Sequence, residues 1–270
     1  MLGRIRAKHV ALGMAVYAGG VYAGANIMNR GKDQDKGQEY DKVDERSRCE
    51  TFSSIAHKYD KEIGFSERTS GILGFRKRLL GNCTGKVLEV AAGTGRNLEY
   101  YPSPSVTSGN NKSIGLEIVA TDFNKEMLIE ADKKIHKMRN NSKHNGLNVV
   151  TRVADAQKLP FEDGVFDTVV DTFGICSLEN PLEALREMRR VCKHGGKILL
   201  LEHGRSYHGY SWLNSYLDKR AKQHAVDWGC WWNKDVHALV KEAGIEIDSQ
   251  RIHHFGTCYE LVCSPSKSVS

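Results

Sequence analysis

The residues best placed to do chemistry form one short run, residues 87–97, with the sequence VLEVAAGTGRN. Aliphatic residues surround an acid, Glu89, and the run then breaks into a loop of small residues that carries Gly93 and Gly95. This pattern is typical of a buried parallel strand that turns into a helix beneath a nucleotide-like ligand. The glycines allow positive φ angles and a close approach of ligand to backbone, and the amides that open the next helix can bind a carboxylate or a phosphate.

Two further acids follow predicted strands. Asp122 ends the run EIVATDFN and could accept hydrogen bonds from both hydroxyls of a ribose, which suits NAD as well as an adenosyl ligand. Asp155 follows the strand-like run LNVVTRVA, where it is placed to bind an adenine amino group. The third glycine of the dinucleotide fingerprint G-x-G-x-x-G would fall at Leu98, so the glycine spacing argues against a dinucleotide enzyme.

These residues resemble the class I S-adenosylmethionine-dependent methyltransferases, particularly the branch of the quinone-biosynthesis methyltransferases. The resemblance covers residues 52–263 and includes FSSIAHKYD, residues 52–60, which looks like the segment that lies over the cofactor in that branch. It implies that the glycine loop lies under the methionyl part of S-adenosylmethionine, and that the family's usual glycine is replaced by Ala91. The implied cofactor-binding residues are Tyr59, Glu89, Ala91, Gly93, Gly95, Asp122, Phe123, Asp155 and Ala156.

Catalysis by such a protein needs few side chains, because the sulfonium donor is already activated and alignment with the acceptor supplies much of the acceleration. An oxygen acceptor with a high pKa would still need a general base. His203, in LLLEHG after a predicted strand, is the first candidate, ahead of Glu202 and His224. His203 could equally be a hydrogen-bonded loop histidine, and a thiolate acceptor would need no base.

The elements around these residues alternate between strand and helix. Strands are expected near residues 86–91, 117–121, 147–153, 166–171 and 196–202, and the tail is expected to form an antiparallel pair. This order predicts an α/β, Rossmann-like, seven-stranded and mostly parallel sheet with helices on both faces, in a domain over residues 51–266 followed by a short tail, 267–270. Helices are expected around Phe52, Ile55, Ala56 and Tyr59, and over residues 71–80.

A lid segment is expected over residues 203–232, which contain all four tryptophans of the chain. One interpretation is a helix whose aromatic residues fill the space above the sheet. The other is an apolar pocket for the methyl acceptor, facing the bilayer, because aromatic residues favour both pockets and membrane interfaces. The two interpretations are compatible.

The N-terminal part predicts an anchor. Residues 1–29 read as a basic leader and a single membrane-spanning helix, since residues 10–28 carry no charge and would extend roughly 28 Å as a helix. Gly20 and Gly24 have the G-x-x-x-G spacing that suits a partner helix. A secretory signal peptide and a buried or disordered leader are the alternatives. Residues 30–50 read as a polar tether.

The basic, acid-free beginning suits the mitochondrial inner membrane, with the endoplasmic reticulum or a lipid-droplet membrane as the alternative. The net charge of +6 is spread without one basic tract, so no nucleic acid partner is expected. The densest cluster, residues 133–144, reads as a solvated helix end, with an RNA or anionic-lipid contact as the other interpretation.

The seven cysteines contain no C-x-x-C pair and suggest a reducing compartment. His224 and Cys230 lack the partners of a tetrahedral zinc site, so no metal is expected.

Together these features predict a membrane-anchored methyltransferase acting on a small, lipophilic acceptor. A quinone precursor, a phospholipid headgroup and a thiol are all open. A methyltransferase-like assembly or scaffold factor for inner-membrane complexes is the alternative. Methylation of RNA or protein has less support, because the strand end at residues 171–174 reads DTFG rather than the N/D-P-P-Y tetrapeptide used for planar amines.

Overall fold

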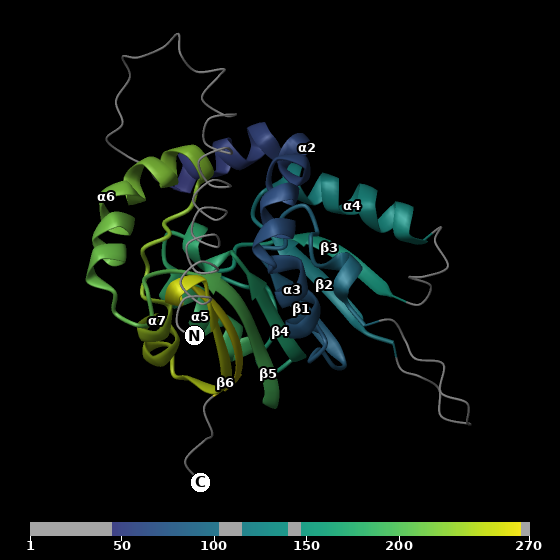
Figure 1. Ribbon diagram of the computed structural model, residues 1–270. Helices are drawn as coiled ribbons and strands as arrows, with labels where there is room; N and C mark the ends of the chain where they lie inside the picture. Colours follow the sequence, from purple (N-terminus) through teal and green to yellow (C-terminus); the bar gives the residue numbers. More distant parts are fainter. Residues whose placement is uncertain (1–44, 103–114, 140–146, 266–270) are drawn as a thin grey trace, which may run out of the picture.

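A seven-stranded sheet forms the centre of the computed structural model, which describes residues 45–102, 115–139 and 147–265 (Figure 1). Its strands are β1 (Lys86–Val90), β2 (Glu117–Asp122), β3 (Asn148–Val153), β4 (Phe166–Thr172), β5 (Cys192–His203), β6 (Ile245–His253) and β7 (Cys258–Pro265). Their order across the sheet is β3-β2-β1-β4-β5-β7-β6, and β7 runs in the direction opposite to the other six of these strands. The predicted fold class and the closing antiparallel pair are confirmed.

The strand positions follow from the hydrophobic runs of the sequence, because a parallel strand covered on both faces is apolar along its length. In β1 the four residues after Lys86 are all buried, and they alternate between the two faces of the sheet. Strand β5 begins at Cys192, four residues before the predicted start. The extra residues form a bulge in β5, opposite Phe166 and Thr168 of β4, so the strand can start earlier and still pair with β4.

Helices cover both faces of the sheet, as predicted. On one face α5 (Pro181–Val191) and α7 (Val236–Glu242) pack on a core that includes Leu88 and Leu200. On the other face α3 (Ile72–Leu80) and α4 (Lys125–Arg139) pack on a core that includes Val87 and Leu201. Adjacent strand residues thus point into opposite cores, and each core depends on the period of two along the strands.

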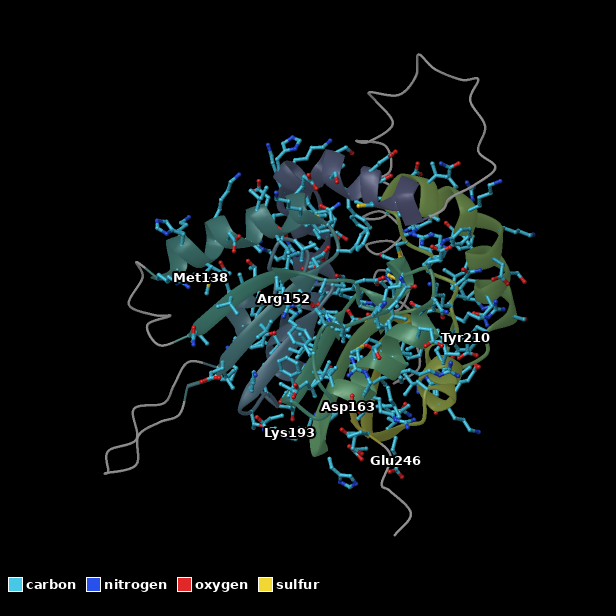
Figure 2. The ribbon with its side chains drawn as sticks, turned by 180° about the vertical axis from the view of Figure 1, so that it is seen from behind. Met138, Arg152, Asp163, Lys193, Tyr210 and Glu246 are labelled. Carbon is cyan, nitrogen blue, oxygen red and sulfur yellow. The ribbon has the colours of Figure 1, made fainter. Side chains whose placement is uncertain are left out.

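Two helices, α2 (Glu45–Ser70) and α6 (Ser211–Trp228), lie above the carboxyl ends of the strands (Figure 1). Helix α2 packs against both α4 and α6. Seen from behind in Figure 2, Met138 on α4 and Tyr210 at the start of α6 mark opposite sides of the molecule. Helix α6 occupies the middle of the predicted lid segment, residues 203–232, and supplies Leu217 and Ala221 to a small third core that includes Trp232.

The predicted N-terminal boundaries are wrong in one respect. The tether was expected to extend through residue 50, yet α2 begins at Glu45, so the last part of that segment is helical. The predicted spanning helix at residues 10–28, with Gly20 and Gly24, lies outside the described residues. Within the described ranges, the structure contains no helix long and apolar enough to cross a membrane.

Candidate cofactor and acceptor site

A cavity of about 290 Å³ opens where the carboxyl ends of β1, β2, β4 and β5 meet α2 and α6. This is the edge at which ligands bind in open parallel sheets, because the loops leaving adjacent strands diverge there. Nine of the residues put forward from the sequence line this cavity. They are Tyr59, Glu89, Ala91, Gly93, Asp122, Phe123, Ala156, His203 and His224.

The glycine loop follows β1 and gives the cavity an open wall. Gly93 has φ +55°, and a Cβ added there would meet nothing within 4 Å, so the backbone at this point is accessible from the cavity. Gly95 has a different role. It does not line the cavity, and a Cβ at its position would lie 2.5 Å from Leu98 Cδ1. Gly95 therefore allows the turn to pack closely on Leu98, whereas Gly93 leaves room for a ligand.

Ala91 has φ +48°, a left-handed conformation that favours glycine, which explains physically why the family usually has glycine there.

Ala91→Gly should therefore stabilise the fold by roughly 0.5–1 kcal/mol, because the relief of backbone strain exceeds the cost of the added freedom of the unfolded chain. Thermal unfolding should show a melting temperature raised by about 1–3 °C. Ala92→Gly is the matched control, since Ala92 is buried and lacks a positive φ, and it should lower the melting temperature. A loss of stability in the Ala91 variant would contradict this account.

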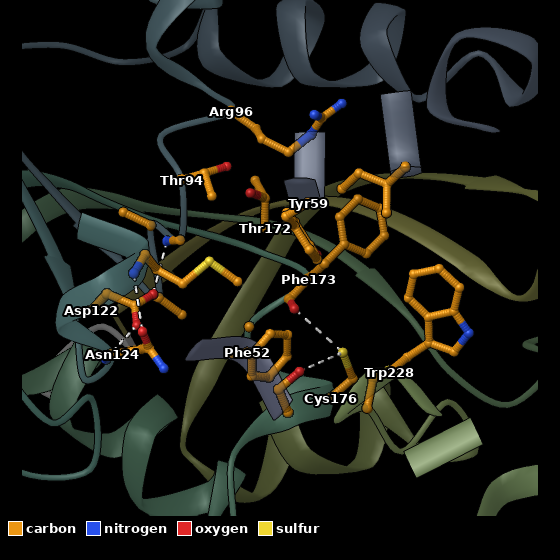
Figure 3. Close-up of a pocket in the computed structure, with 18 of the residues that line it drawn as sticks. Phe52, Tyr59, Thr94, Arg96, Asp122, Asn124, Thr172, Phe173, Cys176 and Trp228 are labelled. Carbon is orange, nitrogen blue, oxygen red and sulfur yellow. Dashed lines mark hydrogen bonds between the residues drawn. The ribbon is translucent and has the colours of Figure 1, made fainter. Parts of the chain in front are cut away.

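Asp122 lies at the end of β2 and faces the cavity from below the glycine loop (Figure 3). Its Oδ2 accepts a hydrogen bond from the Gly93 amide at 2.8 Å, and its Oδ1 accepts one from the Asn124 amide at 2.7 Å. Burial raises the pKa of Asp122 to about 6, although both amides act in the opposite direction. Each oxygen keeps a lone pair for a ligand hydroxyl, so the carboxylate can bind a ribose while it holds the loop in place.

Asp155 does not reach the cavity, contrary to the sequence-based prediction. Its Oδ1 accepts hydrogen bonds from the backbone amide of Gln157 at 2.8 Å and from the side-chain amide of Gln157 at 3.2 Å. Its neighbours Ala154 and Ala156 line the cavity instead. The carboxylate thus stabilises the turn after β3, because an aspartate can bond the amide two residues ahead more readily than it can reach across the loop.

Glu89 is 2% exposed and supports the glycine loop from inside the protein. Its carboxyl accepts hydrogen bonds from the Tyr101 hydroxyl at 2.6 Å and from the Asn97 amide at 2.9 Å. Burial raises the pKa of Glu89 to about 7, and the two hydrogen bonds partly offset this effect. These two hydrogen bonds fix the turn that leaves β1 and so hold the glycine loop in position.

A buried ion cluster fastens α2 above the cavity, and sequence reasoning missed it. Glu67 on α2 pairs with Arg76 at 2.7 Å and with Arg96 at 2.5 Å. Arg96 also pairs with Asp60, and Arg76 donates to Thr172 at 2.7 Å. We call Glu67, Arg76 and Arg96 the α2 clamp. Arg96 directly follows the glycine loop, but its partners lie 29 and 36 positions earlier in the chain, so spacing gave no signal.

Aromatic residues of α2, of α6 and of the loop after β4 form the other side of the cavity. Figure 3 shows Asp122 and Asn124 on one side and Cys176 and Trp228 on the other. Phe52 on α2 meets Tyr59 edge to face at 6.4 Å, and a Cβ on Gly229 would lie 2.7 Å from the Phe52 ring. Helix α2 therefore packs against the end of α6 through the Phe52 ring, an approach that only glycine at position 229 permits. Burial holds the pKa of Tyr59 well above its ordinary value, so its hydroxyl stays protonated.

The three candidate bases have different environments. His203 lines the cavity, with its Nε2 2.7 Å from Cys230 Sγ. His224 stacks on Trp232 at 4.0 Å, and burial lowers the pKa of its imidazole. Glu202 is fully buried, accepts a hydrogen bond from the Gly174 amide, and has a pKa held well above its ordinary value by burial and by Asp171 beside it. Of the three, His203 is the one that lies directly at the end of β5.

Comparison with known proteins supports the same assignment. The sequence model of the ubiE/COQ5 methyltransferase family matches residues 40–216. The chain is 32% identical over 221 residues to "Methyltransferase OMS1, mitochondrial" of Saccharomyces cerevisiae, covering 78% of this chain and 45% of that protein. It is 34% identical over 157 residues to the ubiquinone/menaquinone biosynthesis C-methyltransferase UbiE of Geobacter sp. (strain M21), covering 56% and 60%. The chain spans about half the length of these curated relatives.

Solved structures share the fold at low sequence identity. A S-adenosylmethionine-dependent methyltransferase of Thermotoga maritima has a TM-score of 0.56 at 17% identity, covering 80% of this chain and 99% of that one. The PH0226 protein of Pyrococcus horikoshii OT3 has a TM-score of 0.53 at 24% identity, covering 74% and 92%. The open wall at Gly93 and the carboxylate of Asp122 fit the adenosyl cofactor. The chain belongs to the ubiE/COQ5 methyltransferase family, whose methyl donor is S-adenosylmethionine.

Proposed function

We propose that this protein is an active S-adenosylmethionine-dependent methyltransferase. The observation that carries the proposal is the pairing of Asp122 with the amide of Gly93 at the edge of one cavity, where a ribose and a methionyl group can be bound side by side. When bound, the cofactor supplies an activated methyl group on a sulfonium. The chain then has to hold the acceptor in line with that methyl and exclude water.

The acceptor in this proposal is a small, apolar molecule. Phe52, Phe173 and Trp228 all line the cavity, and Figure 3 shows Trp228 on the side away from Asp122. Aromatic walls favour a lipophilic ligand, because they remove apolar surface from water and offer flat faces to a ring. The Geobacter relative is named for ubiquinone and menaquinone biosynthesis, which is consistent with such an acceptor.

His203 is proposed to act on the acceptor side of the site. It follows β5 directly, lines the cavity, and lies 5.4 Å from the Phe173 ring between centroids. It can therefore contact an acceptor that lies against Phe173. His203→Asn should lower turnover more than it lowers cofactor affinity, which separates an acceptor-side role from a role in cofactor binding.

We also place the protein in a membrane, most simply the mitochondrial inner membrane. The support is the uncharged stretch at residues 10–28 and the yeast relative, whose name is mitochondrial. The endoplasmic reticulum and lipid droplets are the alternatives. Carbonate extraction of cells that express the tagged chain should leave it in the membrane pellet, and imaging should show it in mitochondria. Release into the soluble fraction would reject the anchor.

The catalytic proposal is tested with methyl-labelled S-adenosylmethionine and the full chain in mitochondrial extract. Label should enter the lipid-soluble, small-molecule fraction and be absent with Asp122→Ala. Incorporation into protein or RNA instead would reject the acceptor class. If the folded protein neither binds S-adenosylhomocysteine nor transfers label, while Asp122→Ala leaves cellular function intact, an assembly or scaffold role replaces catalysis.

Cofactor affinity should also depend on pH through Asp122. Its pKa of about 6 means that the carboxylate is ionised at pH 7.5 and increasingly protonated below pH 6, when it accepts ribose hydroxyls less well. Calorimetry with S-adenosylhomocysteine should therefore show a constant Kd above about pH 7 and a rise of up to about tenfold per pH unit below about pH 6. Asp122→Asn should remove this dependence. If the affinity for S-adenosylhomocysteine fell with pH equally in the wild type and in Asp122→Asn, the titrating group would be another residue.

A further inference from the structure

Two thiols and an imidazole meet at the acceptor side of the cavity, although they come from distant parts of the chain. Cys176 lies in the single turn η3 (Ile175–Ser177) after β4, His203 ends β5, and Cys230 follows α6. Their ligand atoms all lie within 4.8 Å of one another. Both cysteines are buried, with 2% and 6% of their surfaces exposed, and neither forms a disulfide.

We propose that Cys176, His203 and Cys230 bind a zinc ion. Two thiolates and a neutral imidazole form a ligand set that zinc prefers, and three protein ligands with one open position are typical of zinc sites that act on a substrate. Binding replaces the proton of each thiol with a bond to the metal and releases two protons to solvent. The resulting centre, with two thiolates and one divalent cation, carries no net charge, which suits a buried site.

The ligand atoms, all within 4.8 Å of one another, lie within about 1 Å of the separations that zinc requires. Zinc bonds of about 2.3 Å to sulfur and about 2.0–2.1 Å to nitrogen place tetrahedral ligand atoms roughly 3.5–3.8 Å apart. The Nε2 of His203 now lies 2.7 Å from the sulfur of Cys230, as a hydrogen bond. An opening of somewhat less than 1 Å would admit the ion, and the half-buried imidazole can provide it by turning toward the cavity.

The loops that carry the ligands are bound to one another. The Trp231 amide donates to the Cys176 carbonyl at 2.9 Å, which holds the two cysteine segments together. His224 Nδ1 and the Cys230 carbonyl lie 2.8 Å apart. Lys234 donates from Nζ to the carbonyl of Ile175 at 3.1 Å and to that of Leu178 at 2.7 Å, and so brackets the turn of Cys176. These contacts hold the ligands near one another in advance, as the outer shells of metal sites do.

An open fourth position would face the cavity, because all three ligand residues line it together with Phe173 and Trp228. A hydroxyl or thiol of the methyl acceptor could take that position, lose its proton to solvent and be held as an anion close to the bound cofactor. This role for the ion rests on the proposed methyltransferase activity, whereas metal binding itself does not. A zinc ion at this position would overturn the sequence-based expectation of no metal, and His203 would be one of its ligands.

The metal content of the full chain tests the inference. Protein purified in detergent with reductant and added zinc should hold about one zinc per chain after dialysis, measured by mass spectrometry of the metal. Cys176→Ala, Cys230→Ala and His203→Ala should each lower this content about tenfold or more. Cys192→Ala is the matched control, since Cys192 is equally buried at the far end of the sheet, and it should retain the metal. Substitution by cobalt should give the charge-transfer absorption of thiolate ligands in the wild type and in the control alone.

The outcomes separate this inference from the proposed function. Wild-type protein that binds S-adenosylhomocysteine but no zinc would reject the metal site alone, as would equal metal content in the cluster variants and the Cys192 control. A Cys176–Cys230 disulfide in the purified protein would also reject it. Stoichiometric zinc in a protein that neither binds S-adenosylhomocysteine nor transfers methyl would support the metal site and reject the proposed function.

Discussion

Replacement of Asp122 by alanine should abolish useful cofactor binding. The carboxylate can accept two ribose hydroxyls, and hydrogen bonds to a charged group contribute about 1.5–3 kcal/mol each. Their loss should raise the Kd for S-adenosylhomocysteine roughly 100-fold or more. The variant also loses the acceptor for the Gly93 amide, so the loop wall of the cavity becomes less ordered. Calorimetry measures the effect directly, and thermal unfolding verifies that the variant is folded.

Asp155→Ala is the matched control for this experiment. Asp155 also follows a strand of the same sheet, but its carboxylate bonds to Gln157 and does not line the cavity. We expect the Kd of the Asp155→Ala variant for S-adenosylhomocysteine to change by less than about threefold, because contacts within a turn outside the cavity contribute little to a ligand site. A large loss of affinity in the Asp155 variant would show that this side chain turns toward the adenine when cofactor binds. It would then restore the prediction made from the sequence.

The second large effect is expected at the α2 clamp. Glu67→Gln keeps the shape of the side chain but removes the charge that lies between Arg76 and Arg96. Side-chain exposure is 7% for Glu67 and 4% for Arg76, so the variant leaves a buried guanidinium without its charge partner. Breaking such a pair costs about 3–5 kcal/mol, and the melting temperature should fall by roughly 6–15 °C.

The pH dependence of stability provides a second measurement on the clamp. Burial acts to raise the pKa of Glu67, but Arg76 and Arg96 outweigh it and lower the pKa below its ordinary value. The stabilisation is therefore complete above the carboxyl pKa of the unfolded chain, about 4.3, and is lost as the pH falls through the lower folded pKa. The difference in stability between wild type and Glu67→Gln should shrink below about pH 4.

Glu183→Gln is the control for charge removal as such. Glu183 pairs with Arg186 on the surface of α5, and both side chains are almost half exposed. An exposed pair of this kind contributes less than about 1 kcal/mol, because water already solvates both charges. Equal destabilisation by the Glu183 and Glu67 variants would show that the α2 clamp has no special weight in the fold.

The sequence alone determined the fold class and predicted that Glu89, Gly93 and Asp122 lie at one edge of the sheet, where they line the same cavity. Continuous apolar runs, such as residues 198–201, and the glycines that follow Glu89 are local features, since both residue type and spacing lie within a few positions. Asp122 was predictable for the same reason, because the end of one strand fixes where its last side chain emerges. None of these predictions required knowing which residues from distant parts of the chain pack against these positions.

Only the tertiary structure decided which distant side chains meet. Asp155 binds its own turn, whereas Glu67 reaches Arg96 across 29 positions of the chain. Cys176 and Cys230 approach His203 because three separate loops converge at one edge of the sheet. The physical reason is that such contacts depend on helix packing angles and loop paths, which many residues set together. A charge or a thiol in the sequence carries no information about the partner that folding will bring to it.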